Sequence, residues 1–104
     1  MKVSIGVKKS LDAKEIINIL KKQGSILKKY GVRKIGLFGS YASGRQKRNS
    51  DIDFLAEFDK PNFNDFMDLV FFLENLFGKK VELITKGNLS PYIQPYVEKE
   101  IKWI

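Results

Sequence analysis

The chain contains neither cysteine nor histidine among its 104 residues. Without cysteine it can form no disulfide framework and no thiolate metal site. Without histidine it cannot use a Ser-His-Asp triad, imidazole acid–base chemistry or a histidine-ligated zinc ion. Any catalysis must therefore depend on carboxylates, lysine, tyrosine or hydroxyl groups.

Long apolar runs are also missing from the sequence. The longest apolar stretch is too short to span a bilayer, and no secretory signal pattern opens the chain, so we expect a cytoplasmic protein with no membrane partner. Apolar residues make up 43% of the chain, which is typical of a globular protein rather than a disordered one. The length predicts a single domain over residues 1–104.

Basic residues outnumber acidic ones by 19 to 12, which gives a net charge of +7. A basic chain can attract nucleic acid by neutralising phosphates, and it can equally attract ATP or an acidic protein. The lysines occur as scattered pairs, as on an ordinary solvated surface, and no base-stacking motif or recognition helix is present. Nucleic-acid binding is therefore the least favoured of the functions considered.

The first part of the chain predicts an arm followed by a helix. Met1–Lys9 is expected to be a loose arm or a short edge strand. Ser10 is expected to cap a helix whose apolar residues recur at helical spacing, with Gly31 as the stop. Gly24 lies within this pattern and weakens it by roughly 1 kcal/mol relative to alanine.

The rest of the chain predicts an α/β (α+β) fold in which a small mixed sheet of three to four strands has helices packed on it. Three apolar runs are expected to be strands: Val32–Phe38, Ile52–Phe58 and Val81–Thr85. A helix is expected over Phe63–Phe77, ended by Gly78, and an amphipathic segment follows Pro91.

Two carboxylates stand at the start of the second predicted strand. Asp51 and Asp53 are two positions apart, and side chains at this spacing point to the same face of a strand. A fixed pair of carboxylates can hold Mg²⁺, which prefers oxygen ligands. A pair of this kind is common by itself, so its meaning depends on the residues around it.

A Gly-Ser pair precedes these carboxylates. Gly39 and Ser40 directly follow the first predicted strand, and ten residues separate Ser40 from Asp51. Such a turn can offer backbone N–H groups and a hydroxyl to a phosphate, and glycine lets the backbone approach closely. A phosphate site beside a metal site indicates a binding site for a Mg²⁺-nucleoside triphosphate.

The signature of Gly-Ser, about ten residues and Asp-x-Asp resembles the minimal nucleotidyltransferase (MNT) branch of the DNA polymerase beta-like nucleotidyltransferase superfamily. The resemblance extends from about Lys14 to the C-terminus and implies the nucleotidyltransferase fold. A third acid on a later strand of that family corresponds to Glu82, although the family more often has aspartate there. A second departure is Ser43, where many relatives have arginine; Arg45 is the candidate replacement.

The resemblance implies an enzyme that transfers a nucleoside monophosphate, expected to be AMP from ATP, to a hydroxyl with two Mg²⁺ ions. It implies these site residues: Asp51, Asp53 and Glu82 as catalytic and metal-binding, with Gly39, Ser40 and Arg45 binding the nucleotide. Many minimal family members are antitoxins paired with a helical HEPN toxin, and some attach AMP to its tyrosine. The acceptor would then arrive on such a partner, or a second copy of the chain would complete the site.

One alternative stays open at this stage. The helix expected over Phe63–Phe77 carries two apolar stripes, more than a helix needs to face one core. It could be wedged between the sheet and the last segment, or it could be a patch that binds a partner. In the second case the protein would neutralise its partner by contact, and charges at Leu69 or Phe72 would abolish the complex.

Overall fold

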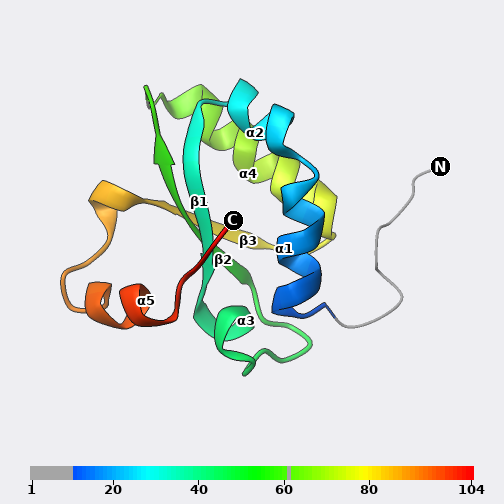
Figure 1. Ribbon diagram of the computed structural model, residues 1–104, viewed down its shortest axis with the longest axis vertical. Helices are drawn as coiled ribbons and strands as arrows, with labels where there is room; N and C mark the ends of the chain where they lie inside the picture. The colour runs from blue at the N-terminus through cyan, green and yellow to red at the C-terminus, as the bar shows by residue number, and fades with distance from the viewer. Residues whose placement is uncertain (1–10, 61) are drawn as a thin grey trace.

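The computed structural model describes residues 11–60 and 62–104, which form a four-stranded sheet with helices on both faces (Figure 1). In chain order the elements are α1 (Ala13–Lys21), α2 (Gly24–Lys29), β1 (Val32–Phe38), α3 (Gly39–Ser43), β2 (Ile52–Phe58), α4 (Phe63–Phe77), β3 (Val81–Thr85), the 3-10 turn η1 (Lys86–Asn88), α5 (Gln94–Glu100) and β4 (Lys102–Trp103). The three predicted strands and the long helix have the predicted bounds. The prediction for Met1–Lys9 lies outside the described residues.

The sheet is mixed, as predicted, with the strand order β3-β2-β1-β4. Strand β1 runs antiparallel to both β2 and β4, whereas β2 and β3 are parallel. A parallel pair needs a crossover connection, and α4 supplies it. The C-terminal end of β1 and the N-terminal ends of β2 and β3 therefore lie side by side at one end of the strands.

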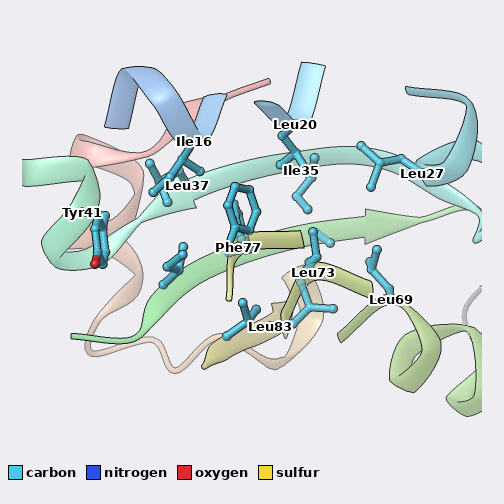
Figure 2. Packing of buried hydrophobic residues seen from close by; sticks show 14 of the residues in the cluster. Ile16, Leu20, Leu27, Ile35, Leu37, Tyr41, Leu69, Leu73, Phe77 and Leu83 are labelled. Atoms are coloured by element: carbon cyan, nitrogen blue, oxygen red, sulfur yellow. The ribbon is translucent and has the colours of Figure 1, made fainter. Parts of the chain in front are cut away.

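The larger core lies between one face of the sheet and helices α1, α2 and α4. Strand residues alternate between faces, and Ile35 and Leu37 of β1 are buried on this side together with every second residue of β2 from Ile52 to Ala56. Figure 2 shows helix residues meeting the strand residues, among them Ile16, Leu20, Ile35, Leu37, Leu73 and Phe77. This core holds β1 and β2 rigidly, and these strands position the residues described below.

Helix α4 belongs mainly to this core. Leu69, Leu73 and Phe77 are buried, while Phe63 and Phe71 are the large apolar residues left exposed on it. A charge at Leu69 would therefore disrupt the core rather than probe an interface. The prediction that a charge at Leu69 tests partner binding was thus wrong, because this residue is buried. None of the helices in the described residues is both long and apolar enough to cross a membrane.

A smaller core covers the opposite face of the sheet, where α5 lies (Figure 1). Val97 of α5 is buried with Phe38 of β1 and Leu55 of β2. Gly36 lies beneath the segment that follows α5, since a Cβ there would come within 2.8 Å of Ile101 and Trp103. The close approach brings the end of α5 down onto the sheet.

The N-terminal helix differs from the prediction in two ways. It begins at Ala13 and is capped by Asp12, whose Oδ1 accepts a hydrogen bond from the N–H of Glu15 at 2.9 Å, rather than by Ser10. It also divides into α1 and α2, with a break immediately before Gly24. The low helix propensity of glycine explains why the break falls there. Gly31 ends α2 as predicted, with a φ of 79°.

Candidate active site

The acidic residues predicted from the sequence lie at or just before the N-terminal ends of the adjacent strands β2 and β3. Asp53 of β2 is in register with Glu82 of the parallel strand β3 and with Phe38 of the antiparallel strand β1. Register partners point to the same face, so Asp53 and Glu82 share the face that α5 covers. Asp51 stands two residues before Asp53, and both Asp51 and Glu82 are exposed.

Asp53 is the most perturbed of these carboxylates. Its side chain is half-buried, and burial is the largest cause that raises its pKa from 3.8 to about 6. The charges of Glu82, Asp51 and Glu100 raise the pKa further, in that order. Each of these three carboxylates is therefore close enough to repel the charge of Asp53, and positive charge placed beside Asp53 would be strongly favoured.

The turn after β1 packs directly against Asp53. Gly39 has a φ of 79°, and a Cβ added there would overlap Oδ2 of Asp53 and lie 3.0 Å from its Cγ. Glycine is required here because another side chain would be strained and would also displace the carboxylate. Strand register and the turn together fix Asp53 beside the backbone of Gly39.

The one-turn helix α3 carries the remaining predicted nucleotide-binding residues. Ser40 is half-buried near its start, and Arg45 is exposed just beyond its end. The hydroxyl of Ser43 donates within the helix to the carbonyls of Gly39 and Ser40, at 3.2 and 3.3 Å. Ser43, where the family resemblance led us to expect arginine, therefore makes its hydrogen bonds within α3.

Glu100, the last residue of α5, lies at the same place and was not predicted from the sequence. Its Oε2 accepts a hydrogen bond from the N–H of Gly39 at 2.9 Å. The two residues are 61 positions apart. No local pattern around Glu100 indicates this contact, because it depends on how α5 packs on the sheet.

The oxygen donors of Asp51, Asp53 and Glu82 are of the kind that Mg²⁺ prefers. Within residues 11–60 and 62–104, no three acidic side chains are gathered closely enough to hold one ion in this conformation. The two ion pairs found in that part of the chain, Arg33–Asp59 and Lys86–Glu57, involve none of these three acids. Burial first, and then the charges of the neighbouring acids, raise the pKa of Asp53, so a cation bound beside it would offset the cost of its negative charge. The residues therefore fit a divalent cation in chemistry and in charge.

The sequence and the structure were compared with known proteins. A family model described as a nucleotidyltransferase domain matches residues 13–104. "Putative protein adenylyltransferase MJ1379" of Methanocaldococcus jannaschii is 44% identical over 95 residues, which cover 86% of this chain and 95% of that protein. "Protein adenylyltransferase MntA" of Thermococcus cleftensis is 38% identical over 96 residues, which cover 90% of this chain and 97% of that protein.

A solved structure agrees with these matches. A chain from the crystal structure of a toxin-antitoxin with AMP-PNP superimposes with a TM-score of 0.67 and 27% sequence identity. The match covers 83% of this chain and 69% of that chain. The resemblance noted from Gly-Ser and Asp-x-Asp is therefore confirmed over almost the whole described fold. This chain belongs to the nucleotidyltransferase domain family.

Proposed function

We propose that this protein is a Mg²⁺-dependent nucleotidyltransferase that moves AMP from ATP to a hydroxyl, with a tyrosine of a HEPN-type partner as the acceptor. The observation that carries the proposal is the position of Asp53. It lies in register with Glu82 and against Gly39, so this one carboxylate links the proposed catalytic acids to the proposed phosphate-binding turn. The names of these relatives describe protein adenylyltransferases, and this supports AMP as the transferred group.

In the proposed reaction the acceptor hydroxyl oxygen forms a bond to the α-phosphorus of ATP. The bond between that phosphorus and the oxygen bridging to the β-phosphate breaks, and pyrophosphate leaves. Glu82, exposed beside Asp53, accepts the hydroxyl proton. The protein contributes mainly by holding the reactants and by balancing the developing negative charge.

The triphosphate of ATP and its metal ion would be held by different residues. Ser40 would hold the outer phosphates through its backbone N–H and hydroxyl, and Arg45 would hold them through its exposed guanidinium. Gly39, whose own N–H donates to Glu100, would let the phosphates approach the backbone closely because it has no side chain. Asp51, Asp53 and Glu82 would hold Mg²⁺. When bound, the metal would supply charge neutralisation for the triphosphate and a lower pKa for the attacking hydroxyl.

The proposal is tested by transfer to the partner. The protein is incubated with labelled ATP, Mg²⁺ and the product of the neighbouring gene as the candidate partner, and the partner's mass is measured. We expect the mass of one or more AMP groups to be added, and replacement of the modified tyrosine by phenylalanine to remove the label. A partner of unchanged mass, with ATP bound but not consumed, would contradict AMP transfer to this acceptor.

The pKa of Asp53 predicts how nucleotide binding depends on pH. Below about pH 6 the carboxyl is protonated in the metal-free protein and must lose its proton before it can bind a cation. We expect the affinity for Mg²⁺-ATP to be constant above pH 7 and to fall about tenfold per pH unit below 6. Calorimetric titrations between pH 5 and 8 measure this, and a flat profile would contradict it.

A second candidate function is neutralisation of a partner by contact alone. The observation that favours it is an exposed group of aromatic residues around α5 and β4, including Tyr92 (86% exposed), Tyr96 (71%) and Trp103 (38%). Large exposed aromatics are typical of interface anchors. If contact is sufficient, Asp51→Asn/Asp53→Asn protein will still neutralise the partner, and Tyr92→Ser/Tyr96→Ser protein will not. If AMP transfer is required, the Asn variant will fail.

A further inference from the structure

Gly39 is the first residue of helix α3, and this short helix has few interactions of its own to hold it in place. Helix α3 has five residues, and Phe38 at its N-cap provides no side-chain hydrogen bond. A single helical turn is unstable alone, because nucleating it fixes several residues for very few hydrogen bonds. The position of Gly39 must therefore depend on contacts made outside α3.

The burial of Tyr41 and Ala42 fixes the far side of this helix against the larger core. On the near side, the contact is the hydrogen bond from the N–H of Gly39 to Oε2 of Glu100. The first N–H groups of a helix have no partner inside the helix, so an acceptor oxygen supplied from another element satisfies one of them. Glu100 thus supplies from α5 the cap that Phe38 lacks.

Glu100 is itself held firmly. Val97, one turn earlier on α5, is buried with Phe38 and Leu55, and the next residue, Ile101, packs over Gly36. The N–H of Ile101 donates to the carbonyl of Val97 at 2.8 Å, which continues the helical hydrogen bonding past Glu100. The carboxylate therefore approaches Gly39 from a packed element rather than from a free chain end.

Movement of Gly39 would displace the side chain of Asp53, because the two residues are in contact. Oδ2 of Asp53 occupies the space where a Cβ of residue 39 would lie, so the turn and the carboxylate are in contact. A shift of the turn by about 1 Å would change the position of this carboxylate and of the phosphate-binding groups together.

We propose that Glu100 is a positioning residue of the active site, which holds the Gly39 turn against Asp53 through its hydrogen bond to the Gly39 N–H. This inference rests on the proposed function. The acceptor oxygen, rather than the negative charge, carries the role. Glutamine at this position retains an oxygen acceptor and should substitute, whereas alanine should not.

The test compares Glu100→Ala and Glu100→Gln with Glu98→Ala and Glu98→Gln. Glu98 lies on the same helix, is exposed and carries the same charge, and its carboxylate accepts a hydrogen bond from Gln94 at 2.9 Å. Two quantities are measured: hydrogen exchange of the Gly39 amide by NMR, without ligand, and the affinity for Mg²⁺-ATP by calorimetry.

We expect Glu100→Ala to speed exchange of the Gly39 amide and to weaken Mg²⁺-ATP binding, each by roughly tenfold. Glu100→Gln and both Glu98 variants should stay within about threefold of the original protein on both measurements. Thermal unfolding of each variant establishes that the chain is folded at the temperature used.

Several results would overturn the inference. Unchanged exchange in Glu100→Ala would show that the hydrogen bond does not hold Gly39, and unchanged affinity would show that it does not prepare the site. Tighter binding by Glu100→Ala would mean that Glu100 competes with phosphate, and equal losses in the alanine and glutamine variants would mean that charge is responsible. If the original protein binds no Mg²⁺-ATP, the proposed function fails. The exchange measurement then still tests whether Glu100 holds the Gly39 N–H.

Discussion

Replacing Asp53 by asparagine is expected to reduce AMP transfer by roughly 10³-fold or more while making the metal-free protein more stable. The loss of activity follows because Asp53 is the proposed metal ligand that touches Gly39 and is in register with Glu82. Groups that act on charge in the transition state have effects of this size or larger when they are removed.

The gain in stability follows from the direction of the pKa shift. The pKa of Asp53 is raised from 3.8 to about 6 in the folded protein, so between these values the folded state binds the proton more tightly than the unfolded chain. Stability is therefore lost as the pH rises through this window. At neutral pH the ionised carboxylate costs about 1–3 kcal/mol, and asparagine should recover much of this.

Thermal unfolding in EDTA and initial rates of AMP transfer measure the two effects. We expect Asp53→Asn to raise the Tm by ~5–10 °C. Asp68→Asn is the matched control, because it removes the same charge from an exposed position on α4. An Asp53→Asn protein that transfers AMP at the original rate, or that is less stable in EDTA, would contradict this account.

The second large effect is expected at Gly39. Gly39→Ala and Gly44→Ala place the same methyl group on residues with nearly equal φ values, 79° and 77°. Both should lose about 1–2 kcal/mol of stability, because alanine is disfavoured in this region. The added Cβ meets nothing within 4 Å at Gly44 but overlaps Oδ2 of Asp53 at Gly39.

The two alanine variants should therefore differ in activity but have similar stability. A carboxylate can move aside cheaply, so the fold of Gly39→Ala survives, but the displaced group is the one that the reaction needs. We expect a loss of ~10²-fold in the rate of AMP transfer for Gly39→Ala and less than about threefold for Gly44→Ala. Equal rates in the two variants would show that the contact between residue 39 and Asp53 has no role.

Much of the fold could be predicted because its signals are local. The strands β1, β2 and β3 are short apolar runs bounded by glycine, acidic or basic residues, and α4 ends at a glycine in the left-handed conformation, Gly78. The division of α1 from α2 was missed because the apolar spacing continues across Gly24. The spacing of apolar residues shows which face is buried and does not show where hydrogen bonding is interrupted.

The candidate site was predictable only where one strand carries the information. The spacing of Asp51 and Asp53 places them on one face. The proximity of Glu82 depends on the parallel register of β3, and before the structure only the family resemblance pointed to Glu82. Glu100 could not be found, since its contact with Gly39 joins two elements packed through the smaller core. Contacts across the sheet require the assembled structure.

The central claim is that Asp51, Asp53 and Glu82 bind ATP through Mg²⁺ beside the Gly39 turn. Calorimetric titration of ATP into the protein at pH 7.5, with Mg²⁺ and then with EDTA, tests it most directly. We predict saturable binding with Mg²⁺, at least ~100-fold weaker binding in EDTA, and the same weakening in Asp51→Asn/Asp53→Asn protein with Mg²⁺ present. Equal affinity in EDTA, or full affinity in the double variant, would contradict the claim.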